Sequence, residues 1–195
     1  KKFEILVVND CSTDNSLNEL KKLSIKYKNL EIISLGERKG QSYALAHGIK
    51  NCKCKTIVTM DGDGQNDPRD VMKLYNVFIS SEYKLIGGIR SKRKDNIIKI
   101  ISSKIANFIR SKILNDNCLD TGCGLKIFEK EIFLNFPFFD GIHRFLPALF
   151  KGFGYKTYFI YVDHRSRFSG KSNYGTFDRL FKGIKDLIKV KRIIR

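Results

Sequence analysis

The sequence predicts an α/β fold with a largely parallel sheet. Short apolar runs rich in β-branched residues alternate with helical patterns along most of the 195 residues. One run, Thr56–Met60, stops abruptly in a cluster of Gly, Asp and Pro, as a buried strand does at the carboxyl edge of such a sheet. Parallel neighbours joined in this way require right-handed crossovers. The length suits one domain with a sizeable core.

The first part of the chain contains two strand-and-helix pairs. The apolar run Phe3–Val8 predicts an opening strand, and the turn-rich residues after it lead into a helix from about Ser16 to Tyr27. Leu30–Leu35 is predicted as the second strand and Gly40–Ile49 as a short helix. The first helix has an approximate apolar face, formed by Leu17, Leu20, Leu23 and Ile25.

The rest of the chain repeats the alternation. Pro68–Ser80 is predicted as a helix whose apolar face is formed by Val71, Leu74, Tyr75 and Phe78. The remaining elements are a strand at Tyr83–Ile86, a helix at Asn96–Leu114, a glycine-flanked turn at Asp120–Lys126 that enters a short strand, a helix that starts at Gly141–Pro147, a strand at Tyr155–Val162 and a helix from about Thr176.

Three carboxylates, those of Asp61, Asp63 and Asp67, fall within seven residues directly after the Thr56–Met60 strand. Repulsion among such groups is usually relieved by a cation. Hard oxygen donors suit Mg²⁺ or Mn²⁺, and Mg²⁺ is commonly held by one or two carboxylates together with substrate phosphates. The stretch therefore favours a metal site that binds a nucleoside diphosphate.

This stretch also allows comparison with two other kinds of loop. An EF-hand calcium loop fails on spacing, because Gln65 occupies the fifth position, Pro68 interrupts the loop and Met72 stands at the twelfth position instead of Glu. A solvated turn with Asp67 as a helix N-cap remains open, since a lone D-x-D match is weak.

The chain is strongly basic, with 37 Lys and Arg against 20 Asp and Glu and a formal net charge of +17. Such a charge indicates an anionic partner, which can be nucleic acid, a membrane surface or a phosphorylated substrate. Basic loops at Gly87–Asp95 and His164–Gly175 each suit a phosphate. The helices from Asn96 and from Thr176 are basic and amphipathic, which is typical of a membrane-surface element but also of ordinary core packing.

The cysteines do not suggest a disulfide framework or a zinc site. There are five, an odd number, without the C-x-x-C or histidine spacings of zinc ligands. Reduced thiols in the cytosol are expected. No apolar run approaches the roughly 18 residues that cross a bilayer, and the start of the sequence does not resemble a signal peptide.

Seven motifs in order resemble a known family. The sequence is similar to family 2 glycosyltransferases of the polyprenyl-phosphate sugar transferase type, the dolichol-phosphate mannosyltransferase-like group, from Ile5 to about Val190. The motifs are V-V-N-D-x-S-T-D, G-Q-S-x-A-x-x-x-G-I, M-D-G-D-G-Q-N-D-P, G-x-R, D-T-G-C-G-L-K, H-R-F-L-P-A-L and H-R-x-R-x-x-G-x-S-x-Y-G.

The resemblance implies a GT-A fold, a Rossmann-like three-layer sandwich with a mostly parallel mixed sheet. It also implies inverting, metal-dependent transfer of a sugar from a nucleoside diphosphate sugar to an undecaprenyl or dolichyl phosphate. A phosphate acceptor is already anionic at neutral pH, so no general base is required. The expected setting is the cytoplasmic face of the membrane, where the protein would be peripheral and would contact anionic lipid.

The resemblance also implies roles for single residues. The metal and diphosphate site would be formed by Asp61, Asp63 and Gln65, and Asp61, Asp63 and Arg90 would carry catalysis. The acceptor phosphate would be bound by Arg90, Lys99 and Ser103, although the family often has arginine where Lys99 stands. The nucleotide sugar would be bound by Asp10, Gly40, Gln41, Asp61, Gln65, His164, Arg165, Arg167, Lys171 and Ser172.

Residues 1–175 are thus expected to form the catalytic domain and residues 176–195 a basic amphipathic helix. The family's first strand, with its P-x-Y-N-E-type segment, is absent from this sequence, and Arg38 stands where asparagine is usual. A family 2 transferase with a saccharide acceptor is an alternative. A nucleic-acid-binding module is another, but no RNA- or DNA-binding motif is present and the acidic loop would repel phosphates without a metal, so no nucleic-acid partner is expected.

Overall fold

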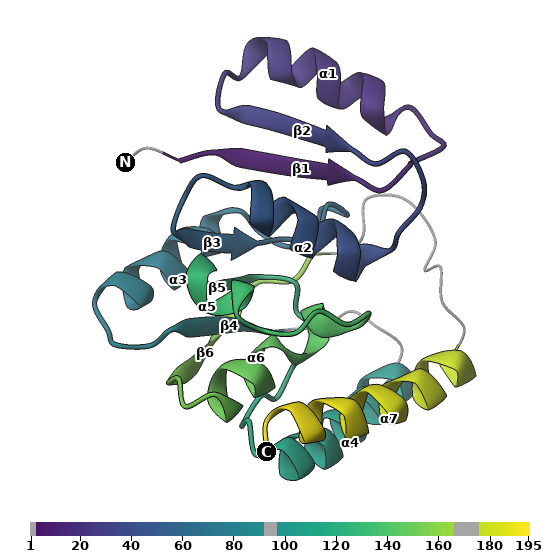
Figure 1. The fold of residues 1–195 in the computed structure, drawn as a ribbon, viewed down its shortest axis with the longest axis vertical. Helices are drawn as coiled ribbons and strands as arrows, with labels where there is room; N and C mark the ends of the chain where they lie inside the picture. The colour runs from purple at the N-terminus through teal and green to yellow at the C-terminus, as the bar shows by residue number, and fades with distance from the viewer. Residues whose placement is uncertain (1–2, 92–96, 166–175) are drawn as a thin grey trace. The chain divides into compact units, whose positions relative to one another are not determined.

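The computed structural model describes the backbone of residues 3–91, 97–165 and 176–195, and the side chains of residues 3–91, 105–165 and 183–195. The chain divides into two compact units (Figure 1). One is formed by Lys1–Ile57 with Lys130–His143, and the other by Val58–Glu129 with Arg144–Arg195.

The first unit is built on two parallel strands, β1 (Ile5–Asn9) and β2 (Leu30–Ser34). The helix α1 (Ser16–Lys26) contacts β2, and α2 (Gln41–Asn51) contacts β1. A short helix, α5 (Lys130–Leu134), contacts α2. The two predicted strands and two predicted helices of this part of the sequence are confirmed, whereas α5 was not predicted.

The apolar face expected for α1 is not buried. No residue of α1 is buried, and the side chains of Leu23 and Ile25 are 44% and 75% exposed. Two strands offer little surface for a helix to cover, so an amphipathic pattern here does not produce a closed core.

The second unit contains a mixed sheet in the order β3-β5-β4-β6. The strands are β3 (Thr56–Thr59), β4 (Leu85–Arg90), β5 (Lys126–Glu129) and β6 (Thr157–Val162). The first two residues of β3 belong to the first unit. β4 runs parallel to β6 and antiparallel to β5. The helices are α3 (Arg69–Ile79), α4 (Ile97–Leu114), α6 (Ile142–Gly152), which begins in the first unit, and α7 (Thr176–Ile193).

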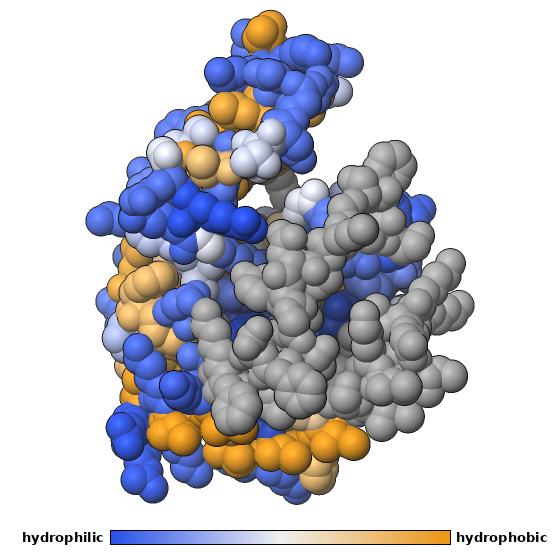
Figure 2. Space-filling model, turned by 90° about the vertical axis from the view of Figure 1, so that its right-hand side faces the viewer, coloured by the Kyte–Doolittle hydropathy of each residue, from blue (hydrophilic) through white to orange (hydrophobic). Residues whose placement is uncertain are grey.

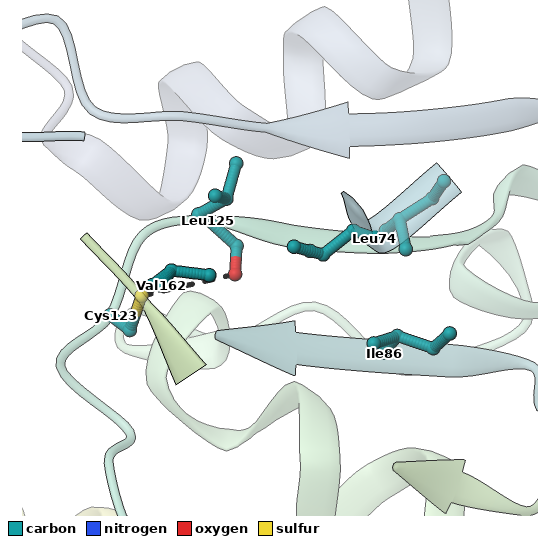
Figure 3. Packing of buried hydrophobic residues seen from close by; sticks show 6 residues of the cluster. Leu74, Ile86, Cys123, Leu125 and Val162 are labelled. Atoms are coloured by element: carbon teal, nitrogen blue, oxygen red, sulfur yellow. Dashed lines mark hydrogen bonds between the residues drawn. The ribbon is translucent and has the colours of Figure 1, made fainter. Parts of the chain in front are cut away.

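The core of the second unit joins α3 to the sheet (Figure 3). Its buried cluster is formed by Leu74, Ile86, Cys123, Leu125, Ile127 and Val162. Val71, Tyr75 and Phe78 pack against this cluster, so the apolar face predicted for α3 is confirmed. Cys123 and Leu125 belong to the segment Asp120–Lys126, which is therefore anchored in the core where it leads into β5.

α4 presents much of its apolar surface to the outside. Phe108 and Ile109 are 63% and 50% exposed, while Arg110 is buried. The guanidinium of Arg110 is accommodated because it forms an ion pair with buried Asp116 and donates to the backbone carbonyl of Cys118.

α7 is held by a polar contact and by a few buried residues. Asp186 accepts a hydrogen bond from Arg144 at 2.7 Å, and Val190 is fully buried, whereas Ile184 and Ile188 are about half exposed. α7 also contacts α4, where the Lys191 ammonium donates to the carbonyl of Ile113 at 3.1 Å. Neither these helices nor any other in the described ranges combines the length and apolarity needed to cross a bilayer.

The five cysteines are free thiols that differ in exposure, with Cys52 and Cys54 partly exposed. Cys11 is exposed and has a φ of 55°, a left-handed backbone conformation. Cys118 and Cys123 are buried. Burial raises the pKa of the Cys118 thiol to about 11 and also raises the pKa of Cys123.

Candidate functional site

The loop that follows β3 is closed by hydrogen bonds from its own side chains. The Asn66 side chain accepts from the backbone N–H of Asp61 at 3.1 Å, and Asp63 accepts from the N–H of Gln65 at 3.1 Å. Gly64 has a φ of +74°, which glycine adopts without strain. These contacts hold Asp61 and Asp63, both partly exposed, at the carboxyl end of the strand.

Asp61 packs against the backbone of Gly124. A β-carbon added at Gly124 would overlap the Asp61 carboxylate, with its Oδ1 at 2.7 Å. The Thr59 hydroxyl donates to the carbonyl of the same glycine at 2.7 Å. The position of the Asp61 carboxylate is thus set by the segment Asp120–Lys126 as well as by its own loop.

The side-chain oxygens of this loop fit a hard divalent cation that is coordinated jointly by the protein and a substrate. Asp61, Asp63 and Gln65 offer carboxylate and amide oxygens, which suit Mg²⁺ or Mn²⁺. In the described part of the chain no three His, Cys, Asp or Glu side chains converge on one point.

A short stretch after β6 pairs with the same loop. Asn66 and His164 form an isolated antiparallel bridge, and the backbone N–H of Arg165 donates to the carbonyl of Gln65 at 2.9 Å. The Gln65 side-chain nitrogen lies 3.4 Å from Nε2 of His164. Three predicted site residues, Gln65, His164 and Arg165, are therefore brought together.

The Asp67 carboxylate pairs with two arginines and is not positioned as a further metal ligand. Its buried carboxylate accepts from Nε and Nη2 of Arg69, at 3.1 and 2.7 Å, and also from Arg165. The hydrogen bonds from Arg69, with a further contribution from Arg165, hold the pKa of Asp67 well below its usual range. The third carboxylate of the acidic cluster thus anchors the stretch after β6.

We expect Asp67→Asn to destabilise the fold at pH 7 more than at pH 3. The pKa of Asp67 is lower in the folded than in the unfolded chain, so the ionised carboxylate stabilises the fold above its ordinary pKa of 3.8. That contribution is lost as the pH falls below this value. Urea unfolding of both proteins at pH 7 and pH 3 measures the difference, and an equal difference at the two pH values would contradict the expectation.

Arg90, at the end of β4, is held by Asp120. The guanidinium donates from Nε and Nη2 to the two carboxylate oxygens, each at 2.7 Å, and the backbone N–H of Arg90 donates to Oδ2 at 3.1 Å. The side chains are 14% and 6% exposed. This bidentate, largely buried pair fixes the plane of the guanidinium.

In the first unit, Asp10 lies at the end of β1 and closes the loop before α2. Its two carboxylate oxygens accept from the backbone N–H groups of Lys39 and Gly40, at 2.7 and 2.9 Å. Gly40 has a φ of +87° and precedes Gln41, the first residue of α2. Asp10, Gly40 and Gln41 are therefore brought together, and the geometry gives Asp10 the turn-closing role that its position also allows.

Five predicted site residues fall wholly or partly outside the described residues. Lys99 and Ser103 lie on α4, but their side chains are outside the described range, and Arg167, Lys171 and Ser172 are outside it altogether. Two residues with clear contacts were missed, namely Asp120 and Gly124. The sequence signal was the glycine-flanked turn D-T-G-C-G, to which no role was assigned.

Comparison with known proteins settles the family. The family model of glycosyl transferase family 2 matches residues 1–135. The chain belongs to glycosyl transferase family 2. Among curated relatives of this family 2 chain, the dodecaprenyl-phosphate galacturonate synthase of Rhizobium johnstonii is 34% identical over 100% of the chain and 58% of the relative. The undecaprenyl-phosphate 4-deoxy-4-formamido-L-arabinose transferase of Pectobacterium carotovorum is 28% identical over 96% of the chain and 57% of the relative.

Solved structures confirm the fold predicted for this family 2 chain. The glucosyl-3-phosphoglycerate synthase of Mycobacterium tuberculosis, in complex with Mn²⁺ and UDP, has a TM-score of 0.68 at 16% identity and covers 96% of this chain and 67% of its own. The mannosyl-3-phosphoglycerate synthase of Rubrobacter xylanophilus has a TM-score of 0.66 at 12% identity, covering 95% and 62%. The chain has the GT-A fold, and it spans a little over half the length of the curated relatives it matches.

Proposed function

We propose that this chain is the catalytic part of a glycosyltransferase that transfers a sugar from a nucleoside diphosphate sugar to a polyprenyl phosphate with inversion. The observation that carries the proposal is the arrangement around Asp120–Lys126. This segment supports both Asp61, on the metal side, and Arg90, on the acceptor side. The names of two relatives, which specify dodecaprenyl and undecaprenyl phosphate, support a polyprenyl phosphate acceptor.

Separate groups of residues would bind the acceptor phosphate, the metal ion and the nucleotide sugar. Arg90 would align the acceptor phosphate, together with Lys99 and Ser103 on α4. Asp61, Asp63 and Gln65 would hold Mg²⁺ or Mn²⁺, which when bound neutralises charge on the departing diphosphate. Asp10, Gly40 and Gln41 would bind the nucleotide, and His164 and Arg165, with Arg167, Lys171 and Ser172, would bind the diphosphate sugar. The acceptor is already an anion, so positioning replaces deprotonation.

Sugar transfer by the full-length protein tests this proposal. Labelled UDP- and GDP-sugars are supplied with undecaprenyl or dolichyl phosphate and Mn²⁺ or Mg²⁺, with and without chelator. Labelled lipid that disappears with chelator is the expected result. Metal-dependent donor hydrolysis without labelled lipid would point to a saccharide or other acceptor, and no reaction with any donor would contradict the transferase assignment.

We also propose that the outer faces of α4 and α7 bind an anionic membrane surface, on its cytoplasmic side. Figure 2 shows apolar surface along the lower edge of the molecule, where the two helices lie in Figure 1. The exposed apolar side chains in the described parts of α4 and α7 are Ile105, Phe108, Ile109, Ile113, Ile184 and Ile188. Lysines and arginines accompany them on the same helices, namely Lys112, Lys185, Lys189, Lys191 and Arg192.

Apolar insertion combined with basic residues is the pattern of interfacial helices, where each Lys or Arg near an anionic surface contributes about 1 kcal/mol. A polyprenyl phosphate acceptor resides in a lipid bilayer. We therefore propose that this face binds a bilayer and not a protein partner.

We expect the protein to sediment with anionic liposomes and the double variant Phe108→Ser with Ile188→Ser to sediment several-fold less. Ile25→Ser, which removes a side chain of similar exposure from α1, is the matched control and should sediment like the wild type. Equal sedimentation of the double variant, or dimerisation through this face in solution, would contradict the membrane assignment.

A further inference from the structure

The segment Asp120–Lys126 is fixed by contacts on both sides. The backbone N–H of Gly88, in β4, donates to the carbonyl of Leu125 at 2.9 Å. A β-carbon at Gly88 would lie 2.8 Å from both Cys123 Sγ and Val162 Cγ2, so the segment packs closely on the sheet. The buried Lys126 ammonium donates to the carbonyl of Cys123 and closes the turn. The segment therefore has little freedom to shift.

Arg90 is in close contact with this segment at two points. Asp120 receives the Nε and Nη2 edge of its guanidinium. Gly122 lies beneath the same group, since a β-carbon there would be 2.7 Å from Nη2. The pair fixes the direction in which the other N–H groups of Arg90 point, which a single hydrogen bond would not do.

Asp61 is in close contact with the same segment at Gly124, two residues after Gly122. An added β-carbon at Gly124 would overlap all three outer atoms of its carboxyl group, so only glycine leaves room for the carboxylate in this position. The backbone of Gly124 is not in the left-handed region, so its conformation would admit alanine. The requirement for glycine comes from Asp61.

We propose that Asp120–Gly124 is a positioning element that sets Arg90 and Asp61 from one rigid segment, with Asp120 orienting the guanidinium and Gly124 seating the carboxylate. The roles of Arg90 and Asp61 rest on the proposed function, whereas the packing on which the proposal depends does not. Displacement of a reacting group by about 1 Å costs roughly 100-fold in rate, so the two contacts are expected to govern transfer strongly.

The Gly124 contact is tested by a stability cycle that needs no activity. We expect Gly124→Ala to lower the Tm of the full-length protein by about 5 °C, as overpacking does. In an Asp61→Ala background the same substitution should change the Tm by less than about 1 °C, because the overlapping carboxylate is gone. Gly36→Ala, where nothing lies within 4 Å of the added carbon, is the matched control. Equal losses in both backgrounds would overturn the Gly124 assignment.

The Asp120 contact is tested by a transfer cycle with Arg90. In the wild-type background, Asp120→Ala should reduce transfer by roughly 100-fold and the isosteric Asp120→Asn by roughly 10-fold. In an Arg90→Ala background, either substitution should reduce transfer by less than about 3-fold. Additive losses at unchanged Tm would show that Asp120 does not act through Arg90. Absence of transfer by the wild type would contradict the proposed function alone, since the stability cycle would still decide the packing inference.

Discussion

Asp63→Asn is expected to reduce sugar transfer by at least about 100-fold while leaving the free energy of unfolding unchanged. The substitution removes the charge that would bind the metal, and loss of one preorganised electrostatic group commonly costs this much. The fold should tolerate the change, because the Asp63 oxygen that accepts the Gln65 N–H is retained in the asparagine amide. Initial rates over a range of Mn²⁺ concentrations, with a urea unfolding curve for each protein, measure both effects.

Asp14→Asn is the matched control for this variant. Asp14 accepts from the backbone N–H of Ser16, two residues further on, at 3.0 Å, as Asp63 does from Gln65, and it lies just before α1. It should transfer sugar like the wild type. Undiminished transfer by Asp63→Asn at a low Mn²⁺ concentration would contradict the assignment of Asp63 as a metal ligand.

Asp116→Ala is expected to lower the free energy of unfolding by about 3 to 5 kcal/mol. Its carboxylate is fully buried, pairs with Arg110 and accepts from the backbone N–H of Cys118 at 3.0 Å. Removing one partner of a buried pair leaves the other charge without compensation, which is far more costly than losing the attraction itself. Urea unfolding monitored by circular dichroism measures the loss.

The comparison variant is Glu82→Ala, which removes the exposed ion pair with Lys156 from the same unit. Exposed pairs contribute little, so its unfolding curve should nearly coincide with that of the wild type. A loss for Asp116→Ala no greater than that for Glu82→Ala would mean that Arg110 finds another partner or reaches water.

The sequence was informative wherever a pattern is local. The strand before Asp61 and the apolar face of α3 follow from residues within one element, and both are confirmed. The predicted order of strands and helices is also confirmed, except that α5 was missed. The metal site was predicted from the spacing of the carboxylates and from the motif resemblance, and the acceptor and nucleotide assignments from the resemblance alone. All three stay predictions. Periodicity also located α4 and α7, but it could not tell which face of each helix lies inward.

The contacts that escaped prediction are non-local. Asp120 is 30 residues from Arg90, and Arg165 is 98 residues from Asp67, so nothing in either neighbourhood indicates the pairing. The burial of Arg110 was missed for a related reason: a charged residue is placed outside by pattern alone, and only the carboxylate of Asp116 makes its burial tolerable.

The uneven placement of the thiols makes the wild-type sequence suitable for selective labelling. Cys118 and Cys123 are shielded and poorly ionised, whereas exposed Cys11 follows directly after Asp10. Cys52 and Cys54, on the same unit as Cys11, have raised pKa values and would react slowly. A maleimide fluorophore or spin label applied briefly near neutral pH would therefore mark Cys11 first, placing a reporter beside the expected nucleotide site without a cysteine-free background.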